Sequence, residues 1–245
     1  MYKTNSSQFK KILALVRDGD FAHAGEREAI DLVFDGFERN SNSNVLDVGC
    51  GLGGTAAIIK NNGLGHVTGI DILSGTILHA KKHYPEVDFL SCDVLDASQK
   101  LDKKFNLIYL FNSFYSFADQ SKSLRELRKV ADENAELIIF DYTDLDNYKE
   151  FCQSDYDVLP SPIKLHDIAF TMKKAGWDLY KQQDLTVEYE RWYEAFVAKI
   201  TQKREQIINN SDEATYDYVY KIYANLLMAI KYGCLGGVVL YARAG

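Results

Sequence analysis

The chain has 245 residues, of which 47% are hydrophobic and 26% charged, a composition typical of soluble globular proteins and unlike that of disordered or fibrous ones. A formal net charge of -7 lacks the cationic surplus of proteins that bind nucleic acids or anionic lipids through phosphate contacts, so we expect neither a nucleic-acid nor a membrane partner. Because α/β folds of this length commonly form one domain, we treat residues 1–245 as a single domain.

The four cysteines are far apart in the sequence and form no CxxC pair. Neither a zinc cluster nor a disulfide framework is therefore indicated, and we expect no metal site. The N-terminus has no apolar signal core, and no run of about 20 apolar residues occurs. These features predict a cytoplasmic protein, which we expect to be a monomer or a homodimer.

Helical spacing of apolar residues predicts two helices, at residues 7–17 and 25–39, within an N-terminal helical cap that covers residues 1–40. Strand and helix patterns then alternate. The expected strands are at residues 45–48, 67–72, 89–92, 105–111 and 136–142. The expected helices between them are at residues 55–61, 77–83 and 121–131.

The pattern changes after residue 142. A helix at residues 166–175 and a strand at 177–187 complete the expected core, residues 41–187. Two long helices, at residues 189–208 and 212–232, form a helical insertion over 188–233, and the last strand lies within 234–245. Alternation with nearly continuous apolar strands predicts a doubly wound, mostly parallel seven-stranded α/β sheet of the Rossmann-like type.

A glycine-rich turn directly follows the first expected strand. Gly49, Gly51 and Gly53 lack a Cβ, so the backbone can turn sharply and a ligand can lie against it. Asp47 precedes the turn and Cys50 lies within it. A dinucleotide loop usually reads GxGxxG and offers amides to a pyrophosphate, whereas carboxylates suit the cationic amino and sulfonium groups of S-adenosylmethionine (SAM).

Two further carboxylates end the next two strands. Asp71 can accept hydrogen bonds from the ribose hydroxyls of an adenosyl group, and Asp93 can meet the adenine amino group. The glycines with Asp71 would also suit an NAD enzyme. However, no Tyr-x-x-x-Lys pair of an NAD(P)-dependent oxidoreductase follows a strand, and Asp47 and Asp93 favour SAM.

In order and spacing, the glycine turn and the four strands after it resemble the successive motifs of the class I SAM-dependent methyltransferases. The resemblance covers residues 45–142 well. It implies that SAM is the cofactor and S-adenosyl-L-homocysteine (SAH) the product, with the loop glycines at the methionine end. The residues that this resemblance assigns to the cofactor are Asp47, Gly49, Cys50, Gly51, Gly53, Asp71, Ile72, Asp93, Val94, Phe111 and Asn112.

A fainter resemblance links the chain to the phosphoethanolamine and sarcosine/dimethylglycine N-methyltransferases. It depends on residues 21–25, 137–142 and 164–167, on the helical insertion and on residues 232–237. Many relatives carry a His two residues before the position of Asp119, but this chain has Phe117 there. Because a neutral amine needs no general base whereas an alcohol does, we expect a small-molecule acceptor with an amine nitrogen.

Candidates for the acceptor side come from strand ends, the cap and the insertion. Tyr115 and His23 are the candidate catalytic residues. The candidate substrate-binding residues are Tyr115, Tyr142, His166, Tyr189 and Trp192. Aromatic rings in the insertion can bind a cationic ammonium group, although their helical spacing is also that of residues packing onto the sheet.

Two alternatives remain open on the sequence. One is methylation of a quinone precursor or of another carbon or oxygen acceptor. The other, suggested by the missing motif His, is a SAM-binding protein without catalytic activity.

Overall fold

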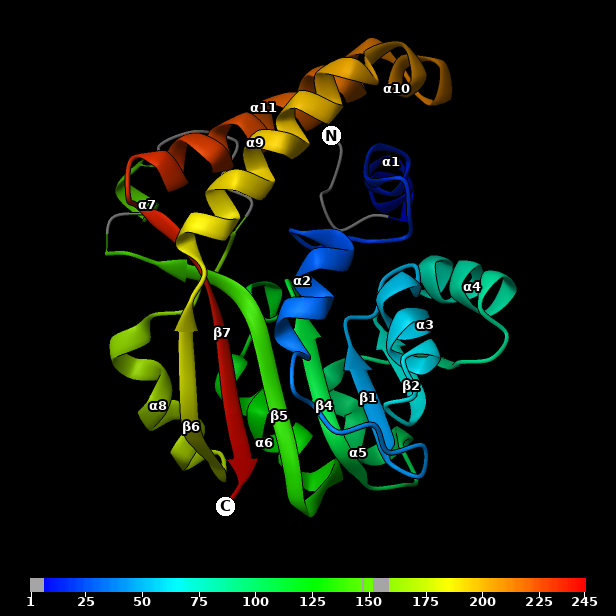
Figure 1. Ribbon diagram of the computed structural model, residues 1–245, viewed down its shortest axis with the longest axis vertical. Coiled ribbons are helices and arrows are strands. Elements are labelled where there is room, and N and C mark those ends of the chain that lie inside the picture. Colours follow the sequence, from blue (N-terminus) through cyan, green and yellow to red (C-terminus); the bar gives the residue numbers. More distant parts are fainter. Residues whose placement is uncertain (1–6, 147, 152–158) are drawn as a thin grey trace.

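The computed structural model describes residues 7–146, 148–151 and 159–245. One sheet of seven strands, in the order β3-β2-β1-β4-β5-β7-β6, forms its centre (Figure 1). Neighbouring strands from β3 to β5 pair in parallel, while β7 is antiparallel to both β5 and β6. The strands are β1 (Asn44–Val48), β2 (His66–Asp71), β3 (Asp88–Ser91), β4 (Phe105–Phe111), β5 (Ala131–Asp144), β6 (Trp177–Asp184) and β7 (Leu235–Ala244). The expected mostly parallel, seven-stranded α/β fold is confirmed.

Helices cover both faces of this sheet. The α-helices are α1 (Ser7–Arg17), α2 (Glu26–Val33), α3 (Gly54–Asn61), α4 (Ser74–His83), α5 (Ala97–Lys100), α6 (Gln120–Val130), α7 (Tyr148–Phe151), α8 (Leu165–Lys174), α9 (Thr186–Gln202), α10 (Arg204–Asn210) and α11 (Glu213–Lys231). Two short 3-10 helices, η1 (Val94–Asp96) and η2 (Phe114–Ser116), follow β3 and β4.

The residues of β4 show why the strands are almost continuously apolar. Tyr109 and Phe111 belong to the core on the face covered by α2, α3, α9 and α11. Ile108 and Leu110 belong to the core on the opposite face, under α5, α6 and α8. Successive strand side chains point to opposite faces, so a strand covered on both sides needs apolar residues at every position.

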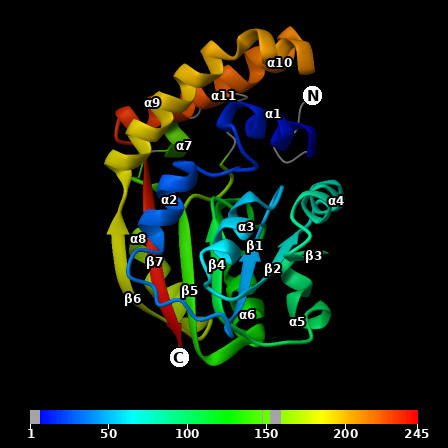
Figure 2. The same ribbon diagram turned by 45° about the vertical axis from the view of Figure 1, so that its right-hand side comes forward.

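The N-terminal helix and the late helical insertion lie together beyond the carboxyl ends of the parallel strands (Figures 1 and 2). α1 contacts both α9 and α10. Segments from opposite ends of the sequence therefore form one cover over the strand ends, where α/β proteins bind their ligands.

Several expected boundaries were wrong. We call residues 18–25, between α1 and α2, the cap turn. The helix after it, α2, ends at Val33 rather than at residue 39, and the chain turns again at Gly36, where φ is +78°. The helix expected at residues 189–208 is two helices that meet at Lys203, whose ammonium group donates to the carbonyl of Leu15, 2.8 Å away. The strand expected at residues 177–187 ends at Asp184, so the insertion begins earlier.

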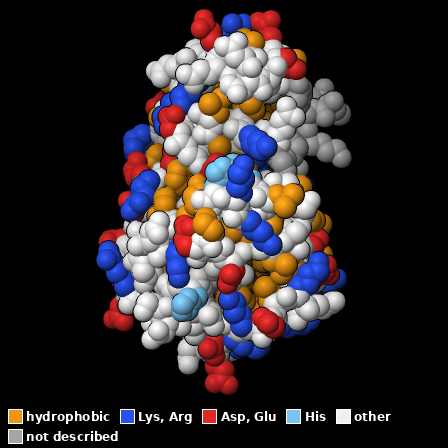
Figure 3. Space-filling view, turned by 90° about the vertical axis from the view of Figure 1, so that its right-hand side faces the viewer, with side chains coloured by type: hydrophobic (Ala, Val, Ile, Leu, Met, Phe, Trp, Pro, Cys, Tyr) orange, Lys and Arg blue, Asp and Glu red, His pale blue; other side chains and the backbone are white. Residues whose placement is uncertain are grey.

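The surface in Figure 3 carries basic and acidic side chains interspersed with one another. Among the described residues, no helix is long and apolar enough to cross a membrane. The same residues contain no group of three or more His, Cys, Asp or Glu side chains placed to hold a metal ion. A cytoplasmic location and a monomeric or dimeric state stay predictions.

Candidate functional site

A cavity of about 300 Å³ lies where the carboxyl ends of the strands meet α1 and α11. On one side it is lined by the loops that follow β1, β2 and β3, which we call the donor side. On the other side it is lined by residues after β4 and β5 and by α11, which we call the acceptor side. The expected site residues that line it are Gly49, Asp71, Ile72, Asp93, Val94, Phe111, Asn112, Tyr115 and Tyr142.

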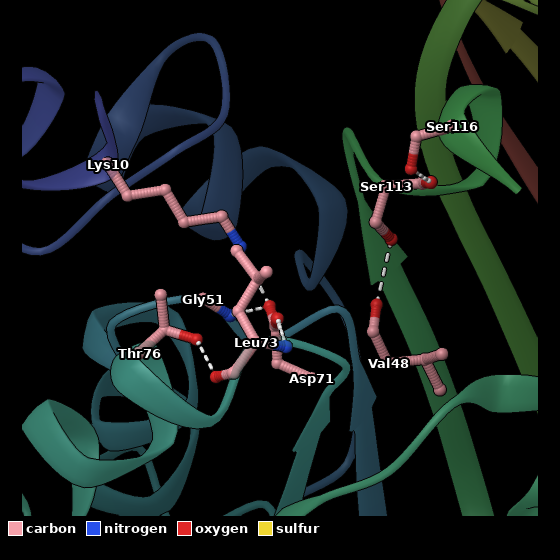
Figure 4. A network of polar contacts seen from close by, with 8 residues as sticks. All are labelled: Lys10, Val48, Gly51, Asp71, Leu73, Thr76, Ser113 and Ser116. Atoms are coloured by element: carbon pink, nitrogen blue, oxygen red, sulfur yellow. Dashed lines mark hydrogen bonds and ion pairs between the residues drawn. The ribbon is translucent and has the colours of Figure 1, made fainter. Parts of the chain in front are cut away.

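The glycine turn takes a backbone course that few other residues could follow. Gly49 has a φ of +81°, and a Cβ there would lie 2.5 Å from the Cβ of Ser113. Ser113 is held in place by its hydroxyl, which donates to the carbonyl of Val48 at 2.8 Å (Figure 4). Absence of a side chain at Gly49 therefore lets the ends of β1 and β4 approach each other at the floor of the cavity.

Asp71 organises the donor side. One carboxylate oxygen accepts from the backbone N–H of Gly51 at 2.9 Å, and the other accepts from the N–H of Leu73, also at 2.9 Å. The ammonium group of Lys10, on α1, lies 2.8 Å from the first of these oxygens (Figure 4). Lys10 thus forms an ion pair with Asp71, the residue that we expect to bind the ribose of the cofactor. This ion pair connects α1 to the donor side.

Apolar surfaces surround this carboxylate. Ile72 is 65% exposed although it lines the cavity, which places an apolar side chain beside Asp71. Val94 lines the cavity as the first residue of η1. Asp93 caps that short helix by accepting from the N–H of Leu95 at 2.9 Å. Two apolar side chains beside two carboxylates suit an adenine ring and its ribose.

Asp47 and Cys50 are buried behind the glycine turn and do not line the cavity. Burial raises the pKa of Asp47 to about 7, and the nearby charge of Asp71 acts in the same direction. One oxygen of Asp47 has no hydrogen-bond partner among the described residues. Because Asp47 does not line the cavity, its contact with the cofactor stays a prediction.

Two tyrosines of the core, Tyr115 and Tyr142, line the acceptor side, together with Tyr223 of α11. The rings of Tyr115, in η2, and Tyr142, near the end of β5, meet edge to face with centroids 5.3 Å apart. The hydroxyl of Tyr142 is hydrogen-bonded to that of Tyr193, in the insertion. Burial raises the pKa of Tyr115 and Tyr142 well above the ordinary value, so their hydroxyls remain protonated.

Asp141 positions these two tyrosines, although sequence reasoning did not single it out. Its carboxylate accepts from the backbone N–H of Tyr142 at 2.7 Å and from that of Tyr115 at 3.1 Å. It is fully buried, and this desolvation raises its pKa to about 7. The sequence did contain a signal for Asp141, since it is a charged residue within the apolar part of β5. A buried carboxyl group needs specific hydrogen-bond partners, so such a residue is a candidate for a structural or functional role.

Asn112 joins the cap to the insertion. Its backbone has a φ of +44°, uncommon for a residue other than glycine. The side-chain oxygen accepts from the N–H of Ala24 at 2.9 Å, and the amide donates to the hydroxyl of Tyr189 at 2.9 Å. Tyr189 is therefore fully buried as a support of the cavity wall and does not line the cavity itself.

Gly51 and Gly53, in the glycine turn, are not among the residues that line the cavity. Three further expected site residues do not line it either. His23 is buried with its ring nitrogens 2.9 Å from the hydroxyl of Thr55 and 2.9 Å from the carbonyl of Ala24, and burial lowers its pKa to about 3. Trp192 packs over the cap turn and donates to Glu28 at 3.0 Å. The side chain of His166, at the start of α8, is 61% exposed at the surface.

The cover supplies cavity residues that the sequence did not identify. All but Leu159, which is in no helix, belong to helices whose apolar spacing was recognised but whose contact with the strand ends depends on the tertiary fold. They are Phe9, Lys10 and Leu13 on α1, Leu159, and Ile222, Tyr223 and Leu226 on α11.

With this geometry established, similarity to known proteins identifies the family. Residues 39–208 match a family model described as a methyltransferase domain. The chain belongs to the methyltransferase domain family. This family uses SAM, so the expected cofactor agrees with the donor side of the cavity.

Relatives of this methyltransferase act on different acceptors. A phosphoethanolamine N-methyltransferase of Plasmodium falciparum is 27% identical over 147 residues, which cover 57% of this chain and 55% of the relative. The 24-methylenesterol C-methyltransferase 3 of Arabidopsis thaliana is 25% identical over 182 residues, covering 69% and 50% respectively. The chain spans about half the length of the curated relatives it matches.

A solved structure supports the fold over almost the whole chain. Phosphoethanolamine N-methyltransferase 2 of Haemonchus contortus, in complex with phosphomonomethylethanolamine and SAH, superposes with a TM-score of 0.83 at 16% identity. The match covers 98% of this chain and 58% of the other. The fold of this methyltransferase is therefore shared with an enzyme of the branch that the sequence resembled.

Proposed function

We propose that this methyltransferase transfers the methyl group of SAM to the neutral nitrogen of a small amine, with Tyr115 and Tyr142 beside the acceptor. The observation that carries the proposal is the absence of a general base among the described residues on the acceptor side. Among the described residues, carboxylates line the cavity only at Asp71 and Asp93, both on the donor side, and no histidine lines it. Phe117 lines the cavity at the position where many relatives carry a histidine.

An amine acceptor fits this lack of a base. SAM, when bound, supplies a methyl group on a cationic sulfur. Most alkylamine is protonated at neutral pH, so the reacting species is the neutral fraction, which has already released its proton to the solvent. That fraction has a free electron pair and needs only to be aligned with the methyl carbon, whereas an alcohol must lose a proton in the same step. His23 cannot supply this base, because both ring nitrogens have partners and the ring lies outside the cavity.

The tyrosines serve such an acceptor in two ways. Their protonated hydroxyls can hydrogen-bond to the neutral amine and orient its electron pair. Their ring faces can then stabilise the ammonium product, by roughly 0.5 to 2 kcal/mol for each well-placed ring. Because Asp141 holds the backbone of both residues, it fixes where the two rings stand.

One observation favours carbon methylation as a second candidate. The cover helices bring several aliphatic side chains to the cavity, and an alkene would also need no base before it attacks the methyl carbon. The sterol C-methyltransferase among the relatives is consistent with such an acceptor. We rank it second because tyrosine hydroxyls have a clear use with an amine and none with an alkene.

Product analysis tests the proposal. The protein is incubated with SAM and, separately, with primary amines, secondary amines, phenols, quinols and alkenes, and methylated products are identified by mass spectrometry. We expect N-methylated products only. Methylation confined to oxygen or carbon acceptors would overturn the proposal.

A pair of tyrosine variants links this activity to the cavity. Tyr115→Phe removes one hydroxyl and should lower kcat/KM for the best amine about tenfold, the effect of losing one hydrogen bond. SAH affinity should not change, since Tyr115 lies on the acceptor side. Tyr220→Phe, on the exposed side of α11, is the matched control and should behave like the wild type.

A further inference from the structure

The cover supplies an apolar wall to the cavity. Phe9 and Leu13 on α1, and Ile222 and Leu226 on α11, are spaced four residues apart, so each pair lies on one face of its helix. Leu159 also lines the cavity. None of the five is more than 5% exposed. We call these five residues the apolar wall.

The described cations near this wall, Lys10 and Arg17, both have carboxylate partners. Among the described residues that line the cavity, Lys10 is the single cation, and it is ion-paired with Asp71 on the donor side. Arg17 lies outside the cavity lining, where it is paired with Glu26 at 2.6 Å and stacked 3.7 Å over the ring of Phe196. The chain between Phe151 and Leu159 contains no Lys or Arg.

An anionic acceptor would be costly in such a place. Phosphate and carboxylate groups are bound by Arg or Lys through charge-assisted hydrogen bonds. Against aliphatic side chains, an anion would lose its hydration without a compensating partner, which disfavours binding strongly. An alkyl or ring carbon gains from the same surroundings, because each buried methylene is removed from water.

We infer that the acceptor is an amine carried on an apolar carbon chain or ring, without a phosphate or carboxylate group. This inference rests on the proposed N-methylation and adds the class of the rest of the molecule. The acceptor of this chain would then differ from that of the relatives named for phosphoethanolamine, although the fold is shared. The apolar wall, rather than the strand ends, then determines which amine is accepted.

An alkylamine series tests the inference on the wild-type protein. Values of kcat/KM are measured with SAM and ethylamine, butylamine or hexylamine, and with phosphoethanolamine as the anionic comparison. We expect kcat/KM to rise about three- to fourfold with each added methylene until the cavity is filled. Phosphoethanolamine should be at least about 100-fold poorer than butylamine, since among the described residues the one cation that lines the cavity is already paired with Asp71.

Variants of α11 locate the effect. Leu226→Lys places an ammonium group in the apolar wall and should lower kcat/KM for hexylamine at least about tenfold while SAH affinity is retained. Met228→Lys, on the same helix but 43% exposed, is the matched control and should leave the series unchanged. Should Leu226→Lys fail to fold, as judged by circular dichroism, Ile222→Ala is used, and it should flatten the dependence on chain length.

Binding to the SAH-loaded protein is measured in parallel by calorimetry, with the same amines and with hexanol. Stronger binding of longer chains without N-methylation would contradict the proposed function and support the apolar wall. N-methylation that favours phosphoethanolamine, or that is independent of chain length, would overturn the inference and leave the proposed function standing. Failure of every alkyl compound to bind would also overturn the inference.

Discussion

His23 shows how burial decides what a titratable side chain can do. Its position in the cap turn made it a candidate catalytic residue, yet its ring lies against Phe111 and Phe140 with both nitrogens engaged. The lowered pKa means that the ring stays neutral through the physiological range. Arg17 adds to this shift through its positive charge. We therefore interpret His23 as a structural link between the cap turn and α3.

The pKa of His23 makes a prediction about stability in acid. Its folded pKa of about 3 lies below the ordinary value of 6.5, so between these pH values the unfolded chain binds a proton that the native protein does not. His23 should therefore reduce the free energy of unfolding as the pH falls from 6.5 towards 3, by at most about 1.4 kcal/mol per pH unit. Urea unfolding of the wild type and His23→Gln at pH 7, 6, 5 and 4 measures the difference.

Asp47 and Asp141 act in the opposite direction, because their pKa values are raised to about 7 and their contribution to stability is lost as the pH rises through that value. The difference between wild type and His23→Gln cancels their effect. His66→Gln, at an exposed histidine in β2, is the control for the His-to-Gln replacement itself. A wild-type advantage over His23→Gln that stays constant from pH 7 to 4 would refute the assignment.

Several strand-end residues singled out in the sequence line the cavity, whereas most residues of the cover were not identified, and the cofactor and substrate roles of all these residues stay predictions. Asp71, Asp93 and Tyr142 line the cavity because each follows or ends a strand, a position that local patterns reveal. Trp192 and His166 do not line it, since their environment depends on how helices far apart in the chain pack. The same dependence hid Asp141, whose partners are backbone amides rather than a motif.

The N-terminal cap contacts the helical insertion at Gly25, directly before α2. Gly25 has a φ of +74°, and a Cβ there would lie 2.6 Å from the indole ring of Trp192. The backbone N–H of the preceding residue, Ala24, donates to the side-chain oxygen of Asn112, which lines the cavity. A small residue at Gly25 thus allows α9 to pack on the cap turn and, through Asn112, supports the wall of the site.

Replacement of Gly25 tests this packing. Gly25→Ala should lower the free energy of unfolding through backbone strain at positive φ and through the clash with Trp192, which together cost roughly 2 to 4 kcal/mol. Gly36→Ala is a close match, because φ there is +78° and no atom lies within 4 Å of the added Cβ. It should cost only the strain, about 1 kcal/mol. Equal losses for the two variants would show that the contact with Trp192 does not matter.

The break between α9 and α10 shows a limit of element prediction. Apolar spacing continues across Lys203, so the pattern indicated one helix over residues 189–208. The helices separate where Lys203 donates to the carbonyl of Leu15, nearly the whole chain away. Local periodicity therefore predicted that helices exist in the insertion, while a distant partner determined where they end.

The whole molecule combines a sheet that presents the donor side with a cover that completes the acceptor side. Lys10 links the two parts, because it comes from α1 and reaches Asp71 (Figure 4). Residues of both α1 and α11 line the cavity, so we expect bound SAM and amine to contact both helices. Binding should then hold the cover in place by adding contacts to both helices.

Hydrogen exchange of the protein with and without SAH measures this effect. We expect SAH to slow exchange of backbone amides in α1 at least about fivefold, because Phe9, Lys10 and Leu13 all line the cavity. α11 should be protected around Ile222 and Leu226. The comparison element is α8, which lies under the opposite face of the sheet and contributes no residue to the cavity, so its exchange should be unchanged. Protection confined to the glycine turn, with α1 and α11 exchanging as before, would contradict this expectation.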